Sequence, residues 1–98
     1  MTEQSGVSLA AEDAAEKLVG FLARACAARW PATEPKDGTA RVLSGDVLDS
    51  MALVELLAFI EREFGVALAC TVDEIRRLET PAHLAREIVR RQQGAGAS

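Results

Sequence analysis

Apolar residues recur at helical spacing through the middle of this 98-residue chain. Between residues 49 and 65 they stand three or four positions apart, which is the repeat of one face of an α-helix. Asp49 is a good helix N-cap and Gly65 is a good stop signal, so a helix is predicted to open at Asp49 or Ser50 and to end near Phe64. The expected core stripe of this helix is Leu53, Leu56, Leu57, Ile60 and Phe64.

The same spacing predicts a first and a last helix. Ser8 can cap the first helix, which runs to about Arg29, because the residue before proline in Trp30-Pro31 is pushed out of the helical region. Thr80-Pro81 begins the last helix as a capping hydroxyl followed by proline, and this helix is expected to end near Arg91. The expected inner faces are Ala14, Leu18, Phe21, Leu22 and Ala25 in the first helix, and Leu84, Ala85, Ile88 and Val89 in the last.

The segments between these helices predict a long loop and one short helix. PATEPKDGTARVLSGDV (31–47) has two prolines and two glycines and indicates a loop, whereas TVDEIRRL (71–78) predicts one or two helical turns. VALAC (66–70) is too short and isolated to form a strand. The predicted fold is therefore all-α: a four-helix bundle with a long loop between helices 1 and 2 and a short helix 3. We expect one domain over residues 1–98, with a core at about 8–91 and flexible tails at 1–7 and 92–98.

Composition narrows the class of protein. Apolar residues make up 49% of the chain, which supplies a core, and no uncharged apolar run is long enough to cross a membrane. The N-terminal segment is polar and acidic, unlike a signal peptide, so we expect a cytoplasmic protein, and a monomer. Cys26 and Cys70 are too few for a disulfide framework and are expected to be reduced, partly buried thiols.

The net charge of −4 is concentrated in one segment. Residues 46–65 contain five acidic side chains and one basic side chain, Arg62, while the rest of the chain is balanced. Phosphate binding requires a basic surface, so nucleic acid is disfavoured as a partner and so is a DNA-binding helix-turn-helix. A basic protein surface is the favoured partner because its potential is complementary.

Few residues are suited to catalysis or to metal binding. His83 is the single histidine, no cysteine spacing supplies further metal ligands, and no glycine-rich phosphate loop is present. A serine–histidine–acid triad could be drawn from Ser50 and His83, but nothing in the sequence places them together. Glu61 and Glu63 are typical of a solvated helix face. We therefore expect no catalytic residue and no metal site, and a chain that is not itself an enzyme.

Ser50 is the side chain with the strongest claim to a function. It follows a polar loop at the first helical position, so its hydroxyl is expected to be exposed, although it could simply help Asp49 to begin the helix. Three features favour a site: the long loop ends here, the acidic excess surrounds it, and Met51 and Ala58 place apolar groups beside Glu55 on an exposed face. Free N–H groups at a helix start also suit an attached phosphate.

Residues 48–66, LDSMALVELLAFIEREFGV, resemble the acyl carrier and peptidyl carrier protein superfamily. The family pattern is Asp-Ser-Leu or Asp-Ser-Met, then apolar positions, a glutamate five residues after the serine, and Glu-x-x-Phe-Gly near the helix end. A weaker likeness extends over residues 9–91 and includes the long loop and the short third helix. The positions that match the pattern are Ser50, Met51, Val54, Glu55, Leu56, Glu61, Phe64 and Gly65.

The resemblance implies a carrier of acyl or aminoacyl groups. Ser50 would bear 4′-phosphopantetheine, donated from coenzyme A by a phosphopantetheinyl transferase, and Asp49 would help to present the serine to that enzyme and its Mg²⁺. The cargo would be a thioester on the terminal thiol, supplied by an adenylating acyl or aminoacyl ligase and passed to acyl-processing or condensing enzymes. These partners would dock on Met51, Val54, Glu55, Ala58, Glu61 and Arg62 of the second helix.

The chain departs from the family pattern at three places. A glycine is usual three or four residues before the serine, but here those positions are Val47 and Asp46, and the glycine is Gly45. Arg62 stands where many fatty-acid carriers have a second glutamate. The segment after Phe64 is slightly longer than in fatty-acid carriers, and it resembles that of free-standing D-alanyl and other aminoacyl carriers.

These departures bear on which kind of carrier the chain resembles. They favour a specialised pathway, such as nonribosomal-peptide or polyketide assembly, over a housekeeping fatty-acid carrier. Two alternatives from other classes stay open. One is a non-carrier helical interaction module, and the other is a small hydrolase that uses Ser50 and His83.

Overall fold

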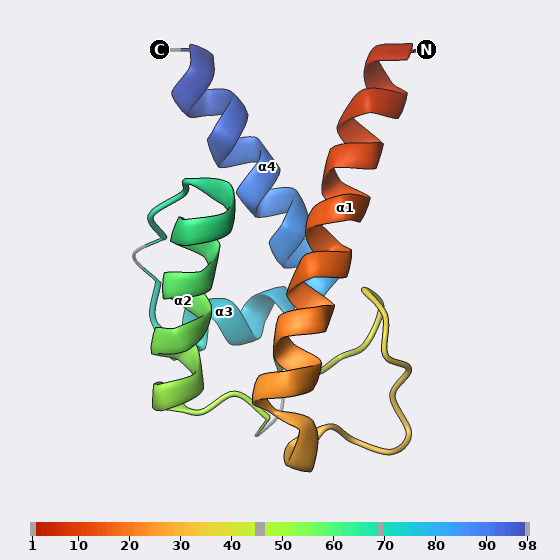
Figure 1. Cartoon of the computed structure of the whole chain (residues 1–98), viewed down its shortest axis with the longest axis vertical. Coiled ribbons are helices and arrows are strands. Elements are labelled where there is room, and N and C mark those ends of the chain that lie inside the picture. The colour runs from red at the N-terminus through yellow and green to blue at the C-terminus, as the bar shows by residue number, and fades with distance from the viewer. Residues whose placement is uncertain (1, 45–46, 69, 98) are drawn as a thin grey trace.

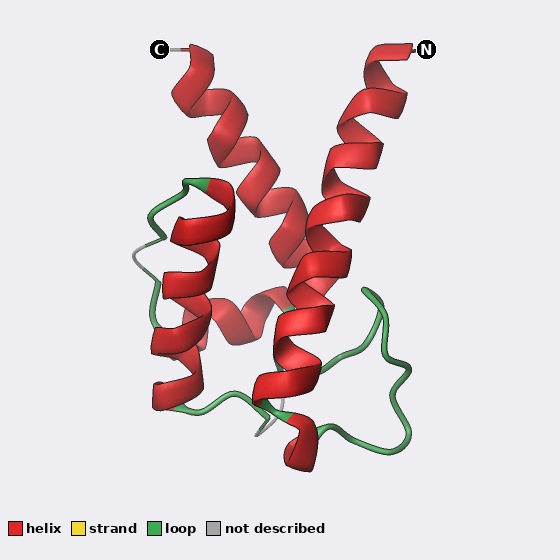
Figure 2. Ribbon diagram, viewed as in Figure 1, coloured by secondary structure: helices red, strands yellow, loops and turns green. Residues whose placement is uncertain are grey.

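Helix is the only regular secondary structure in the described residues of this computed structural model, which are 2–44, 47–68 and 70–97 (Figures 1 and 2). Side chains are described for the residues of these ranges between 10 and 93. The all-α fold is as predicted, with a long loop before the second α-helix and a short third one. In chain order the elements are α1 (Thr2–Ala25), the 3-10 helix η1 (Ala27–Arg29), α2 (Ser50–Phe64), α3 (Val72–Leu78) and α4 (Pro81–Ala97).

The helices surround a single hydrophobic cluster. α1 and α4 make the most extensive helix–helix contact, and they diverge toward the two chain ends, which lie at the same end of the molecule (Figure 1). α2 stands beside them, and the short α3 packs against α4. All four α-helices send fully buried side chains into the cluster, among them Leu18, Leu22, Leu56, Ile60, Ile75, Leu84 and Ile88.

The long loop before α2 is part of the core. Two backbone hydrogen bonds fasten it to the junction of α3 and α4: the Leu43 N–H donates to the Glu79 carbonyl at 3.0 Å, and the Ala82 N–H donates to the Gly38 carbonyl at 2.9 Å. The loop also contributes five buried apolar side chains, Ala40, Val42, Leu43, Val47 and Leu48. The loop that leads into α2 is therefore held against the core by buried side chains and by backbone hydrogen bonds.

The helix ends near α2 and α3 follow the local signals in the sequence. Asp49 caps α2, and Gly65 ends it with a left-handed φ of 70°, a conformation in which a glycine has no Cβ clash. Thr71 caps α3 through a reciprocal pair of hydrogen bonds with Glu74. The Thr80 hydroxyl accepts the N–H of His83 at 3.2 Å, which is the predicted cap of α4.

The outer ends of α1 and α4 differ from the prediction. α1 begins at Thr2 rather than with a cap at Ser8, and it ends at Ala25, after which η1 continues to Arg29. α4 runs on to Ala97, so the residues predicted as tails are helical where they are described. Neither end contains a proline that would block a helix, and a serine can occupy a helix interior as well as a cap. At Arg29 the tighter 3-10 turn is a common way for a helix to finish.

The inner faces differ at two positions. Ala25, predicted in the core, is exposed in the last turn of α1, and the neighbouring Cys26 is buried instead. Phe59 of α2, which was not in the predicted stripe, is buried and stacks on Phe21 of α1 with a ring-centroid distance of 4.6 Å. The other predicted positions on α1, α2 and α4 are buried or half-buried.

Candidate functional site

Ser50 is the first residue of α2, and it is exposed. The residue that caps the helix is Asp49, whose carboxylate Oδ1 accepts the backbone N–H of Ala52 at 2.8 Å. No hydrogen bond of the Ser50 hydroxyl to another described residue is present. Because the capping is done by its neighbour, the Ser50 hydroxyl is left at the surface and available for reaction.

Arg29 of η1 lies against the capping carboxylate. Its guanidinium is 2.7 Å from Oδ2 of Asp49, and both side chains are about half exposed. The Ala52 N–H and then the Arg29 guanidinium hold the pKa of the Asp49 carboxyl below its usual value. Sequence reasoning did not include Arg29 in the site, because it lies on another element twenty residues earlier and no local pattern connects the two.

A shallow pocket of about 310 Å³ lies between the end of α1, η1 and the start of α2. Cys26, which is 5% exposed, is among its lining residues, and burial raises the pKa of this thiol so that it stays protonated. The full lining is Ala25, Cys26, Ala28, Arg29, Asp49, Met51, Ala52 and Glu55. Asp49 and Met51, the residues immediately before and after Ser50 in the chain, therefore both line this pocket.

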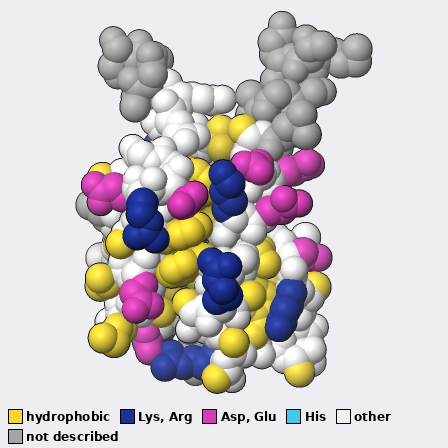
Figure 3. All heavy atoms as spheres, in the orientation of Figure 1, with side chains coloured by type: hydrophobic (Ala, Val, Ile, Leu, Met, Phe, Trp, Pro, Cys, Tyr) yellow, Lys and Arg dark blue, Asp and Glu magenta, His cyan; other side chains and the backbone are white. Residues whose placement is uncertain are grey.

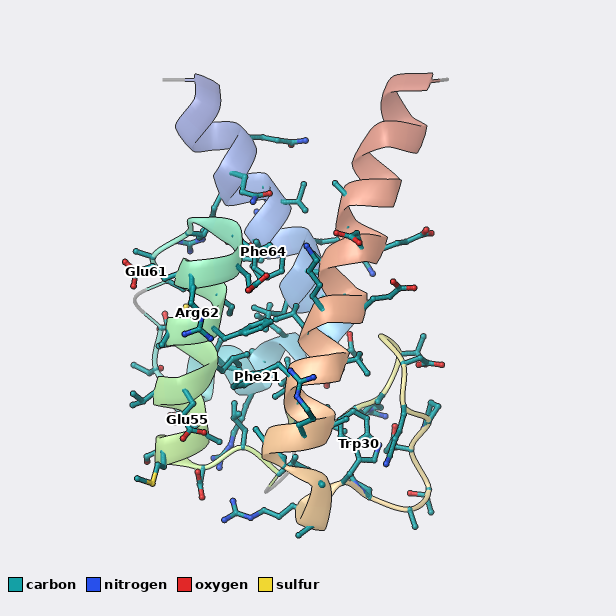
Figure 4. All side chains as sticks on the ribbon, in the orientation of Figure 1. Phe21, Trp30, Glu55, Glu61, Arg62 and Phe64 are labelled. Carbon is teal, nitrogen blue, oxygen red and sulfur yellow. The ribbon has the colours of Figure 1, made fainter. Side chains whose placement is uncertain are left out.

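The residues predicted for partner docking form one exposed stripe along α2. Met51 and Val54 are 75% and 66% exposed, and they are the large hydrophobic side chains most open to solvent in the described chain. Glu55, Arg62 and Glu61 project from α2 at successive levels in Figure 4. The stripe consists of Met51, Val54, Glu55, Ala58, Glu61 and Arg62, which are all exposed and which the helical repeat places on one side of α2. The helix thus brings together the side chains that the sequence singled out.

Apolar side chains are visible between α1 and α2. On the face seen in Figure 3 they have both acidic and basic groups on either side. An aromatic cluster also lies where the two helices meet: the rings of Phe59 and Phe64 meet edge-on with their centroids 6.3 Å apart, and Nζ of Lys17 lies 5.9 Å from the centroid of the Phe64 ring. Asp46 and Gly45, two positions that were noted in the sequence, lie outside the described residues.

A larger cleft lies away from Ser50. It measures about 800 Å³ and is lined by α1, the loop segment 36–39 and the start of α4. Its lining includes the exposed, charged side chains of Glu16, Lys36 and Arg86, and it includes none of the residues predicted for the site. We therefore place the candidate site at Ser50 and not in the larger cleft.

The other candidate residues from the sequence, His83 and Cys70, have no described contact with Ser50. Nδ1 of His83 lies 2.9 Å from the Leu78 carbonyl, and no hydrogen bond between His83 and Ser50 is found in the described chain. Cys70 is half-buried and free, and burial raises the pKa of its thiol. Among the described residues no group of three or more His, Cys, Asp or Glu side chains is arranged to hold a metal ion. None of the described helices combines the length and apolar character needed to cross a membrane.

Comparison of the chain with protein-family models, with curated proteins and with solved structures finds no match.

Proposed function

We propose that this chain is a carrier protein without catalytic activity of its own, which holds an acyl or aminoacyl group as a thioester on a 4′-phosphopantetheine arm attached to Ser50. The observation that carries the proposal is the exposed hydroxyl of Ser50 at the first position of α2, with helix capping left to Asp49. The carrier-like pattern of residues 48–66 supports it, and so does the short α3 after the long loop.

The residues around Ser50 fit the phosphate end of such an arm. A phosphodiester on the Ser50 oxygen would lie at the N-terminus of α2, where free backbone N–H groups and the helix dipole favour negative charge. Arg29 stands beside this point and already holds Asp49, which limits repulsion between that carboxylate and the phosphate. The arm would supply the terminal thiol that bears the cargo.

The exposed stripe on α2 is the proposed docking surface for the partner enzymes. The transferase, the adenylating ligase and the downstream acyl-processing or condensing enzymes would meet the stripe on α2, with Met51 and Val54 as apolar contacts. The glutamates of the stripe would favour basic patches on those enzymes, so that docking is fast and sensitive to salt. A specialised pathway, of the nonribosomal-peptide or polyketide kind, is proposed ahead of fatty-acid synthesis, and the working site is the cytoplasm.

The test is enzymatic loading followed by intact-protein mass spectrometry. The apo protein is incubated with coenzyme A, Mg²⁺ and a promiscuous phosphopantetheinyl transferase, and we expect a mass gain of one phosphopantetheinyl group. Ser50→Ala should show no gain, whereas Ser44→Ala, which removes another exposed serine, should load like wild type. No gain on wild type, or an equal gain on Ser50→Ala, would exclude the carrier function.

One observation favours a second candidate, a helical interaction module without an arm. Met51 and Val54 are exposed whether or not Ser50 is modified, and a protein interface needs such apolar groups. This module would bind a protein partner through α2 equally well with Ser50 or with alanine at position 50. Partner binding that survives Ser50→Ala, together with absent loading, would favour it over the carrier.

A further inference from the structure

The pocket between η1 and α2 lies next to the proposed attachment point. Asp49 and Met51, the residues on either side of Ser50, both line it, although Ser50 itself does not. A flexible arm on the Ser50 oxygen therefore starts beside this pocket and has only to turn toward α1 to enter it. Its opposite wall comes from Ala25, Ala28 and Arg29 at the end of α1 and in η1.

The chemistry of the pocket is varied for such a small surface. Arg29 supplies a cation with five N–H donors, and its 2.7 Å contact to Oδ2 of Asp49 is made through one guanidinium nitrogen. Ala25, Ala28 and Ala52 form small apolar walls, and Glu55 adds a carboxylate that accepts N–H groups. A ligand that suits this lining has an anion at one end, a compact aliphatic group beside it, and amide N–H groups further along.

Phosphopantetheine has this order of groups: a phosphodiester, a branched aliphatic segment, two amides and a thiol. Resting on the proposed function, we propose that the pocket is a docking site for the arm itself, with the phosphodiester at Arg29 and the aliphatic segment against the alanines. At about 310 Å³ the pocket is at the lower end of the range for small-molecule sites, which suits part of the arm and not a bulky cargo.

Docking in this pocket is non-covalent. The Cys26 thiol in the lining is buried, and desolvation keeps it protonated, so it does not compete for the thioester as a nucleophile. Met51 and Glu55 line the pocket and also belong to the exposed stripe on α2. A partner that covers these two residues would compete with the docked arm for the same surface.

The test compares backbone amide chemical shifts of the ¹⁵N-labelled protein before and after loading with the unacylated arm. Intact mass first establishes whether the arm is on Ser50. Attachment alone perturbs amides next to Ser50 and, through the Asp49–Arg29 ion pair, the amide of Arg29. Docking also shifts residues 25–28, which line the far wall of the pocket or neighbour it. Ala28→Trp fills the pocket and should abolish the shifts at 25–28. Ala27→Trp, an equally exposed neighbour outside the lining, should keep them.

The outcomes separate the two proposals. A loaded wild type without shifts at residues 25–28, or shifts at these residues that persist in Ala28→Trp, overturns arm docking and leaves the carrier function intact. Failure to load overturns the carrier function, and arm docking falls with it. The apo spectrum of each variant should match that of wild type away from residues 25–29 and 49–55, which establishes that the fold is unchanged.

Discussion

Asp49 joins two elements through one carboxylate. Its Oδ1 accepts the Ala52 N–H and so begins α2, and its Oδ2 pairs with Arg29 of η1. A serine that itself occupied the N-cap position would accept a backbone N–H with its hydroxyl oxygen. Because Asp49 precedes Ser50 and makes the capping hydrogen bond, the Ser50 hydroxyl is not needed to cap the helix.

The two bonds of Asp49 give its contribution to stability a defined pH dependence. Its pKa is lowered in the folded protein, so the contribution is present above the unfolded value of about 3.9 and is lost as the pH falls through the lower folded pKa. Asp49→Asn keeps a capping oxygen but loses the charge, and Asp49→Ala loses both. Urea unfolding at neutral pH should rank wild type above Asn and Asn above Ala. The gap between wild type and Asn should narrow as the pH falls below the unfolded value of about 3.9, and a constant gap would show that the carboxylate charge is not its cause.

The helix ends of α2 could be predicted because each depends on a single local residue. Asp49 and Gly65 act within one turn of the backbone, so their type is sufficient. The buried face was harder, because Leu56 to Ile60 is apolar on every side. Phe59 is buried because Phe21 of α1 lies opposite, and that pairing depends on how α1 and α2 pack. Arg29 was missed for the same reason, since its partner is on another element.

If partners dock on the exposed stripe of α2, reversing a charge on the stripe should weaken docking more than reversing one elsewhere on the helix. Glu55 lies on the stripe, and Glu63 is equally exposed but lies on another side of the helix. Glu55→Lys should lower kcat/KM for loading by the transferase about tenfold at low salt, because it reverses a charge in the docking surface, and the loss should shrink as salt is raised. Glu63→Lys makes the same change in net charge and should load nearly like wild type. Equal losses in the two variants would indicate a net-charge effect in place of a docking surface on α2.

The bundle as a whole depends on a segment that has no helical pattern. The loop between η1 and α2 was predicted from its prolines and glycines, but nothing in its spacing indicated that Val42, Leu43 and Leu48 are buried. Their burial comes from packing against side chains of the helices in the common core, which the loop's own sequence does not reveal. The backbone bond from Leu43 to Glu79 closes that junction, and Glu79 holds a left-handed φ of 68° there.

Truncating a buried side chain of this loop should therefore lower the free energy of unfolding as much as truncating a core residue of a helix. Leu43 is fully buried, so Leu43→Ala should destabilise the protein by about 2–5 kcal/mol, whereas Thr33→Ala at an exposed position of the same loop should change stability by less than about 0.5 kcal/mol. Urea unfolding followed by circular dichroism measures both variants. In the native protein the Leu43 N–H should exchange with solvent at a rate close to that of the slow amides of α2, because it opens only when the α3–α4 junction opens. Fast exchange at Leu43, together with a small effect of Leu43→Ala, would mean that α2 is positioned by the helices alone and that the loop only connects them.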